Sequence, residues 1–407
     1  MLEDPTRPPL GARPIGADQR LRLALLLGAV TAFAPFATDM YLGSLGDIAA
    51  DFATDAGSAQ ITVSTFFAGM AAGQLFYGPA IDRWGRKKPL MFGTALFAVT
   101  SALLAIAPDI QSFVVLRFIE AIGGCAGMII ARAIIRDVFD LGGASAMLSQ
   151  MMLVQGLGPV LAPIIGAQIV AWVSWRWIFV ALAVSGAFWF AMVGWKLPET
   201  LPPEARRATR FRDLLGAFAG LLRRSEFVLP SAVAAASMGA IFAFIGGSAF
   251  VFMEHFGLGR TAYSLVFGAN AVCMIVASQI NRILVRRVAP GRIVLGAVVF
   301  ASVAALGLLA AAPLAPWTVF VVPLFLALGT APIIGANAQA IAMSRSGEYA
   351  GTASSLIGIV QYSVAGTVIA LVGALHDGTA LPMAGAIVAS YLISLALAGW
   401  AHAHGRL

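Results

Sequence analysis

Three ionisable residues lie away from the ends of long apolar segments: Asp39, Arg117 and Glu120. A charge at the centre of a membrane-spanning helix costs about 2.5–3.5 kcal/mol on insertion scales, so these residues are where function is sought. Burial in a low-dielectric cavity disfavours the charged form of a carboxyl. Asp39 is therefore a candidate for proton or substrate coupling. The alternative interpretation is a helix-end acid in the headgroup layer, because Asp39 lies near the predicted end of its helix.

Arg117 and Glu120 are three residues apart, which places them on one face of a helix. Two interpretations stay open. The pair is either a structural ion pair that faces the interior of the bundle, or a pair that opens when Glu120 or Asp39 binds a proton. Both apply if they belong to different stages of a transport cycle.

A second group of candidates is polar, aromatic or conformationally unusual rather than charged. The segment 156–166 contains Gly158, Pro159, Pro163 and Gly166. Small residues allow close helix contact and prolines remove backbone donors, so this segment suits a hinge or a tight helix interface, with ordinary small-residue packing as the alternative. Candidates for a substrate cavity, or for packing alone, are Phe36, Gln155, Phe244, Asn270, Asn337 and Gln361.

The elements that position these residues follow from composition. The chain has 407 residues, of which 60% are hydrophobic and 11% charged, whereas soluble domains carry about 25% charged residues. Its apolar runs are about 20 residues long and lack period-2 alternation, which predicts membrane-spanning α-helices. The sequence predicts an all-α integral membrane protein with twelve spans, at 21–42, 59–80, 89–107, 112–134, 144–171, 176–196, 228–252, 262–284, 292–312, 317–342, 350–374 and 381–400.

The spans divide into two six-helix halves. A Pro- and Arg-rich segment interrupts the pattern after the sixth span and predicts a cytoplasmic linker. A faint repeat, in which a Gln within a helix precedes Arg in the next turn, relates Gln74–Arg83 to Gln279–Arg287. The predicted organisation is a disordered cytoplasmic tail at 1–19, a first half at 20–196, the linker at 197–227, a second half at 228–401 and a cytoplasmic tail at 402–407.

The distribution of Lys and Arg along the chain indicates which loops lie on the cytoplasmic side of the membrane. The net charge is +7, but in the twelve-span scheme almost every Lys and Arg falls on one side, with Arg176 and Arg260 on the other and Arg117 within a span. Acids gather on the other side, at Asp47, Asp51, Asp55, Asp109, Glu254 and Asp377. This bias places both termini and the turn at 78–88 in the cytoplasm. It argues against a nucleic-acid partner.

The sequence contains no Gly-x-x-x-x-Gly-Lys-[Ser/Thr] phosphate loop and no His-Glu-x-x-His or Gly-x-Ser-x-Gly element. Nothing therefore predicts ATP drive, an enzyme activity, a cofactor or a metal site. An ion gradient is the expected energy source, since a proton that crosses 100 mV releases about 2.3 kcal/mol. The expected partners are a small-molecule substrate, protons and membrane lipid.

Several motifs together resemble a known family. The turn Gly-Pro-Ala-Ile-Asp-Arg-Trp-Gly-Arg-Lys-Lys at 78–88, Arg117 and the Gly-Pro segment at 156–166 resemble three motifs of proton-coupled drug antiporters of the major facilitator superfamily. Thr-Asp-Met-Tyr-Leu at 38–42, Ala-Arg-Ala-Ile-Ile-Arg-Asp at 131–137, Trp-Arg-Trp-Ile-Phe at 175–179 and Leu-Pro-Glu-Thr at 197–200 are similar to the Bcr/CflA group, exporters of the bicyclomycin- and chloramphenicol-resistance type.

The resemblance implies roles for individual residues. Asp39 is the implied protonatable acid, Arg117 the arginine that responds to it, and the segment 156–166 the antiporter signature. In the turn, whose motif residues are Gly78, Asp82, Arg83, Gly85 and Arg86, Asp82 is implied to face the N-terminus of the eleventh span near Gly351. Arg86 is implied to pair with Asp137, and these contacts to latch the cytoplasmic side in the outward-open state.

This chain departs from the pattern of the group at two places. Gly43 and Gly46 stand where the group usually has prolines, which is expected to loosen the end of the first span. Glu120 stands where the group usually has Gln. The extra acid adds a second proton site, alters the substrate charge preference, or neutralises Arg117.

The sequence therefore predicts an inner-membrane exporter that exchanges protons for small amphipathic, antibiotic-like compounds by alternating access. A monomer is expected, because each twelve-helix unit contains its own pathway. The rival interpretations are a facilitator of the same fold that carries a sugar, amino acid or organic acid, and a membrane receptor that transports nothing.

Overall fold

The computed structural model describes residues 17–139, 141–206, 211–313, 315–346 and 350–407. This part of the chain is helical and contains no strands, as the sequence predicted. The helices of the first group are α1 (Ala17–Thr31), α2 (Phe33–Asp39), the 3₁₀ turn η1 (Leu42–Ser44), α3 (Leu45–Asp51), α4 (Ala56–Trp84), α5 (Lys87–Ala105), α6 (Ile110–Val138), α7 (Leu141–Trp172) and α8 (Arg176–Lys196).

A connecting segment carries a short helix, η2 (Pro203–Ala205), and then α9 (Phe211–Leu222). The second group of helices is α10 (Ser225–Ala249) with its π-helical extension η3 (Phe250–His255), α11 (Arg260–Leu284), α12 (Pro290–Ala311), α13 (Trp317–Ser344), α14 (Ala350–Ala374) and α15 (Leu381–Ala403). We call α1–α8 the first half and α10–α15 the second half.

Ten helical stretches of the described chain are long and apolar enough to cross a membrane. The two remaining predicted spans correspond to α4 and α7, which have 29 and 32 residues. At about 1.5 Å per residue each is longer than the roughly 30 Å hydrocarbon core. Polar residues lower the mean hydropathy of α4, and the apolar part of α7 is the shorter stretch Leu157–Trp172.

Local chemistry explains where several helices begin and bend. Asp55 and Asp109 cap α4 and α6, because each carboxylate accepts a hydrogen bond from the backbone N–H of a serine three residues later, at 2.9 and 2.8 Å. The hydrogen bonds from Ser58 hold the pKa of Asp55 below its usual range. Pro35 lacks the N–H that would bond to the carbonyl of Thr31, so the predicted single helix over 21–42 divides into α1 and α2 at Ala32.

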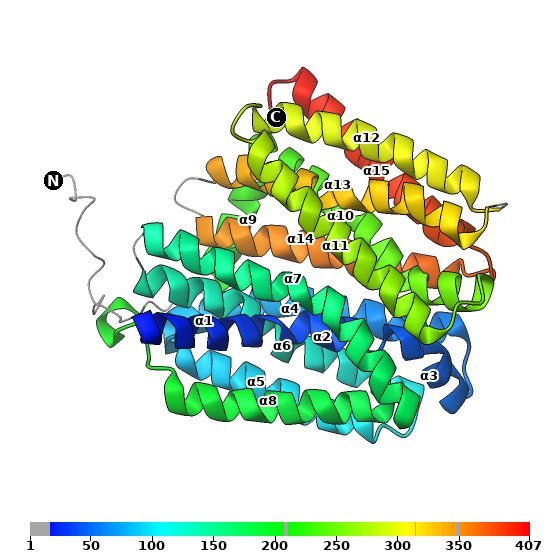
Figure 1. Cartoon of the computed structure of the whole chain (residues 1–407). Coiled ribbons are helices and arrows are strands. Elements are labelled where there is room, and N and C mark those ends of the chain that lie inside the picture. The colour runs from blue at the N-terminus through cyan, green and yellow to red at the C-terminus, as the bar shows by residue number, and fades with distance from the viewer. Residues whose placement is uncertain (1–16, 140, 207–210, 314, 347–349) are drawn as a thin grey trace.

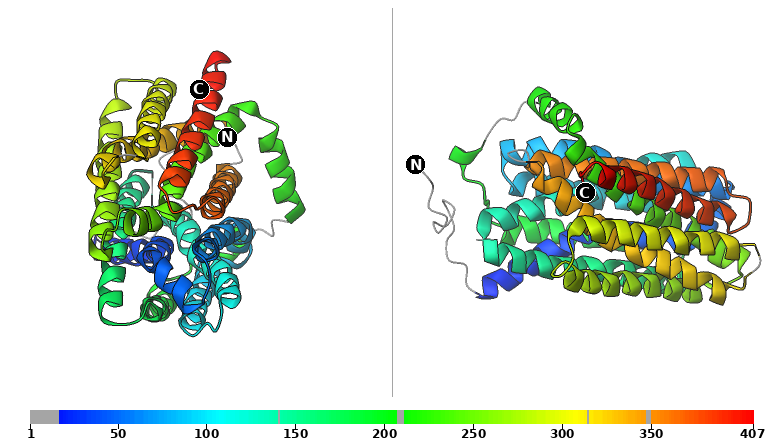
Figure 2. Two further views of the ribbon diagram at one scale, coloured as in Figure 1. Left: turned by 90° about the vertical axis from the view of Figure 1, so that its right-hand side faces the viewer. Right: turned by 90° about the horizontal axis from the view of Figure 1, so that it is seen from above.

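Two predicted boundaries differ from the structure. Residues 1–16 of the predicted tail lie outside the described residues, and α1 begins at Ala17, within the predicted tail. The predicted linker contains the amphipathic helix α9, whose apolar residues Leu214, Phe218 and Leu221 pack on α10, α13 and α14. Figure 2 shows α9 outside the main bundle, near one end of it.

The spanning helices lie side by side along one direction (Figure 1). The two halves meet where α4 packs along α14 and where α7 packs along α11. The turn at 78–88 and α9 lie towards the left of Figure 1, and α3 and the start of α11 lie at the right. We call these the hairpin end and the α3 end of the bundle. Gly158 and Gly166 of α7, Asn270 of α11 and Gln361 of α14 lie on helices of this seam, whereas Arg117 and Glu120 lie on α6, inside the first half.

Candidate functional site

Asp39 is the last residue of α2 and is 4% exposed. No hydrogen bond or ion pair joins its carboxyl group to any residue that the structure describes. It interacts electrostatically with Tyr263 of α11, in the opposite half. A buried carboxylate without a cationic partner is costly, so this environment favours a carboxyl group that binds a proton. The predicted position of Asp39 in an outer headgroup layer does not fit its burial.

Arg117 and Glu120 form the predicted ion pair, and both side chains are fully buried. The second carboxylate oxygen of Glu120 accepts a hydrogen bond from Ser101 of α5 at 2.7 Å. Among the described residues, Arg117 Nε and Nη2 have no hydrogen-bond partner. The guanidinium instead lies over the rings of Tyr41 and Phe66, at 4.4 and 4.3 Å from their centroids, with Phe179 at 5.8 Å. Such cation–π contacts stabilise a desolvated cation.

Tyr41 links the two candidate sites. It follows Asp39 by two residues, and its hydroxyl is 3.1 Å from Thr62 Oγ1 of α4. One short segment therefore places a carboxyl beside α11 and an aromatic ring on Arg117. This cage could not be predicted from sequence patterns, because Tyr41, Phe66 and Phe179 come from three separate segments.

The Gly-Pro segment of α7 forms a tight interface with α2. A Cβ atom at Gly166 would overlap the carbonyl oxygen of Met40, and one at Gly158 would lie 3.0 Å from Pro35 Cβ. Pro159 and Pro163 lie inside α7, which continues as a helix through both. Of the two functions that the sequence left open, the contact between neighbouring helices is present. The peptide after Asp39 rests directly on α7.

The structure does not bring all the predicted cavity residues together. Phe36 lies beside Gly158, with its ring 3.9 Å from the Cβ position of that glycine. Phe244 stacks on Phe267 of α11, at 5.1 Å between ring centroids. Asn337 donates a hydrogen bond to Asn281 Oδ1 at 2.7 Å, which is a packing contact within the second half.

Two buried amides carry unused hydrogen-bonding groups. Asn270 Oδ1 and Gln361 Nε2 have no hydrogen-bond partner in the described chain. The side chain of Gln155 lies outside the described residues.

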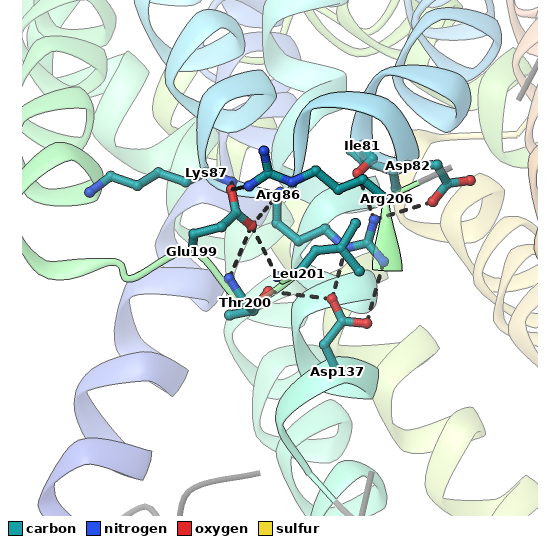
Figure 3. A network of polar contacts seen from close by, with 9 residues as sticks. All are labelled: Ile81, Asp82, Arg86, Lys87, Asp137, Glu199, Thr200, Leu201 and Arg206. Atoms are coloured by element: carbon teal, nitrogen blue, oxygen red, sulfur yellow. Dashed lines mark hydrogen bonds and ion pairs between the residues drawn. The ribbon is translucent and has the colours of Figure 1, made fainter. Parts of the chain in front are cut away.

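The turn at the hairpin end is held by Arg86 (Figure 3). Its guanidinium donates to Asp137 at the end of α6, at 2.7 and 3.3 Å, and to the carbonyl of Ile81 at 2.7 Å. The predicted pair with Asp137 is therefore present. Burial lowers the pKa of Arg86, but the hydrogen bond and the charge of Asp137 raise it by more, so the net shift is upward. The guanidinium of Arg86 therefore stays charged.

Asp82 binds within the turn. In the described chain its partner is Arg86 Nη1, at 3.2 Å, rather than α14. The two helices are nevertheless close there, since a Cβ at Gly78 would lie 4.0 Å from Ser355 Oγ of α14. Arg83 is exposed, and its guanidinium lies 5.7 Å from the ring of Trp84.

Glu199, which follows α8, completes the turn and was not among the predicted site residues. Its carboxylate accepts hydrogen bonds from the backbone N–H groups of Arg86 and Lys87, at 2.8 and 3.3 Å, and so caps α5 (Figure 3). Gly85 has φ +83°, and a Cβ there would overlap this carboxylate. Thr200 also donates to Asp137, at 3.3 Å. The connecting segment is thus tied to the turn.

Known proteins share this architecture. Residues 27–370 match the family described as Major Facilitator Superfamily. The chain is 34% identical over 374 residues to "Bicyclomycin resistance protein homolog" of Haemophilus influenzae, which covers 91% of this chain and 94% of that protein. It is 31% identical over 404 residues to "Uncharacterized MFS-type transporter YdgK" of Bacillus subtilis, which covers 98% of each.

Solved structures agree on the fold. The partially occluded inward-open xylose transporter XylE from E. coli superposes with a TM-score of 0.73 at 13% identity, over 95% of this chain and 98% of that chain. A bacterial homolog of the human lysosomal transporter Spinster, inward-facing and occupied, gives 0.71 at 14% identity, over 96% and 98%. The chain therefore belongs to the Major Facilitator Superfamily, among relatives of the Bcr/CflA drug-efflux type that its motifs predicted.

Proposed function

We propose that this transporter exports small amphipathic compounds across the bacterial inner membrane in exchange for protons, by alternating access. The name of the Haemophilus influenzae relative supports a drug-like cargo. A shorter match, 31% identical over 257 residues, is named "Multidrug resistance protein MdtL" in Salmonella heidelberg. A monomer is the proposed functional unit, with its two termini in the cytoplasm and the α3 end facing outwards.

The observation that carries the proposal is the isolated carboxyl of Asp39. Its protonated form suits the buried site, whereas its charged form needs water or a cation. A substrate that binds beside Asp39 therefore favours release of the proton when it offers the carboxylate hydrogen bonds or positive charge. Proton and substrate then compete for one site, which is the requirement for exchange.

Arg117 and Glu120 support Asp39 indirectly. Because Glu120 already neutralises Arg117, we propose that this pair is a fixed structural centre and that Asp39 carries the proton. Tyr41 anchors the segment that carries Asp39 to this centre, since its ring rests on the guanidinium and it follows Asp39 by two residues. Of the roles left open for the extra acid, this arrangement favours neutralisation of Arg117.

We propose that the substrate is recognised at the seam between the two halves. Phe36, Phe244, Asn270 and Gln361 are proposed contacts, because they combine aromatic surface with buried amide groups that lack partners. Asn337 is a weaker candidate, since Asn281 and its own helix occupy its amide. We propose that the turn at 78–88 latches the cytoplasmic end through Arg86, Asp137 and Glu199.

The test is proton movement driven by substrate in energised inside-out vesicles that contain the protein, followed with a pH-sensitive dye. Phenicols, bicyclomycin, fluoroquinolones and lipophilic cations are added in turn, with Asp39→Asn as the control. We expect proton release with at least one compound and none in the variant. Silence across the panel, with the protein folded and inserted, would favour the rival metabolite facilitator instead.

A further inference from the structure

The first turn of α11 binds the end of the first span at the α3 end of the bundle. Arg260 Nε donates a hydrogen bond to the carbonyl of Gly43, in η1, at 3.0 Å. Its Nη2 pairs with Asp47 of α3. One turn further along α11, Ser264 Oγ donates to the carbonyl of Pro163 in α7, at 3.1 Å. All three contacts join the second half to the first, and we call them the α11 clamp.

Tyr263 lies within the α11 clamp and is fully buried. Its ring packs on Gly43, where a Cβ would lie 3.6 Å from two ring carbons. Its hydroxyl is 3.1 Å from Ser248 Oγ of α10. Asp39 also acts electrostatically on Tyr263. Gly43 lies in η1, between Asp39 at the end of α2 and α3, so the ring packs on the segment that runs from Asp39 towards the α3 end.

Arg260 and Tyr263 are three residues apart, so they lie on neighbouring positions of one helix face and move together. The guanidinium is held by a carbonyl and a carboxylate of the first half, and hydrogen bonds of this charge-assisted type are stronger than neutral ones. When these bonds break, the first turn of α11 is free to leave η1, and Tyr263 leaves with it. Access of water to Asp39 is thereby linked to a surface ion pair.

We propose that Tyr263 is the seal that separates Asp39 from water at the α3 end, and that Arg260 is the positioning residue that holds this seal closed. The proposal rests on the proposed function for the meaning of Asp39 as a proton site. The seal controls access from the aqueous side to position 39, and this access can be measured without following transport or proton movement. The aromatic ring and the arginine stem both pack at Gly43, within ordinary van der Waals distance of its Cβ position.

The test is labelling of Asp39→Cys by a small, membrane-impermeant thiol reagent, in a background where Cys125 and Cys273 are replaced by Ala. The reagent is added on the side from which Ala50→Cys, an exposed position of α3, is labelled. Tyr263→Ala is expected to raise the labelling rate, whereas Tyr263→Phe keeps the ring and the slow rate. Arg260→Gln is expected to raise the labelling rate about tenfold. Losing one charge-assisted hydrogen bond increases the fraction of molecules in which the seal is open by about this factor.

Two controls separate the seal from general damage. Leu265→Ala, at an exposed position two residues along α11, is expected to leave the rate unchanged. The charge-swapped double variant, Asp47→Arg with Arg260→Asp, is expected to restore slow labelling that each single change abolishes. Equal rates for Tyr263→Ala and the parent would overturn the seal. Labelling in Arg260→Gln as slow as in the parent would overturn the positioning role. Neither result bears on whether Asp39 exchanges protons.

Discussion

Asp39 and Arg117 are two buried ionisable residues with different surroundings. Arg117 has a countercharge and an aromatic cage, whereas Asp39 has neither in the described chain. A paired and caged cation is insulated from the transport cycle. The protonation of an unpaired acid responds to a substrate that binds beside it. For that reason we propose that Asp39 alone carries the transported proton.

The first prediction concerns Glu120. The change Glu120→Gln leaves Arg117 buried without its countercharge, and breaking a buried pair costs about 3–5 kcal/mol. We expect a lower melting temperature in detergent, followed by tryptophan fluorescence, while proton coupling persists. Replacing both members, Arg117→Leu with Glu120→Leu, is expected to recover much of the stability, because apolar residues often substitute for buried pairs. Lost coupling in a stable Glu120→Gln variant would instead make Glu120 a proton site.

The second prediction concerns Gly166. A methyl group at this position would overlap the Met40 carbonyl oxygen, so Gly166→Ala must push α7 away from α2. Overpacking of this kind costs about 1–3 kcal/mol, and we expect reduced thermal stability and transport. Gly296→Ala, on α12 where nothing lies within 4 Å of the Cβ position, is the matched control and is expected to be neutral or slightly stabilising. Equal behaviour of the two variants would mean that the α2–α7 contact is not tight.

At the scale of elements, the cap on α5 comes from a segment that is more than a hundred residues away in sequence. Sequence patterns find local caps such as Asp55, because the acceptor and the donor are three residues apart. They do not find Glu199, because its partners lie in another turn. The motif at 78–88 predicted the ion pair of Arg86. The hydrogen bonds that Glu199 accepts from the same turn became visible only in the folded structure.

The third prediction tests that support. Glu199→Gln weakens the acceptor for the backbone N–H groups of Arg86 and Lys87, and losing a helix cap costs about 0.5–2 kcal/mol. We expect amide hydrogen exchange at these two residues to become about 2- to 30-fold faster, given 1.4 kcal/mol per factor of ten. Exchange at the far end of α5 should stay the same. Glu204→Gln, an exposed acid of the same segment, is the control, and equal exchange in both variants would contradict the cap.

At the scale of the whole molecule, the sequence predicted the all-α fold class, the twelve spans and the family. The thickness of the lipid bilayer sets the length of a spanning helix, and the Lys and Arg bias sets the side on which each loop lies. It also predicted that Arg117 pairs with Glu120 and that Arg86 pairs with Asp137. It did not predict the aromatic cage of Arg117, since Tyr41 reaches the guanidinium only after distant helices pack. The break at Pro35 follows from the missing proline N–H, and α9 from its packing on the second half. A span-length rule includes neither effect.

The fourth prediction concerns topology. The proposed orientation places the exposed Ala50 of α3 outside and the exposed Lys88 at the hairpin end inside. In the cysteine-free background, Ala50→Cys is expected to react with an impermeant thiol reagent in intact cells, and Lys88→Cys only after the cells are opened. Reaction of Lys88→Cys in intact cells would reverse the orientation and hence the direction of transport.

The most direct test of the central claim is proton release from purified protein when substrate binds, measured in weakly buffered detergent solution with a compound that the vesicle panel has identified. The account predicts release of about one proton per bound substrate in the parent near the pH where Asp39 is protonated, because substrate and proton compete for that carboxyl. It predicts no release in Asp39→Asn, which should still bind substrate. Release that persists in Asp39→Asn would place the proton elsewhere and contradict the account.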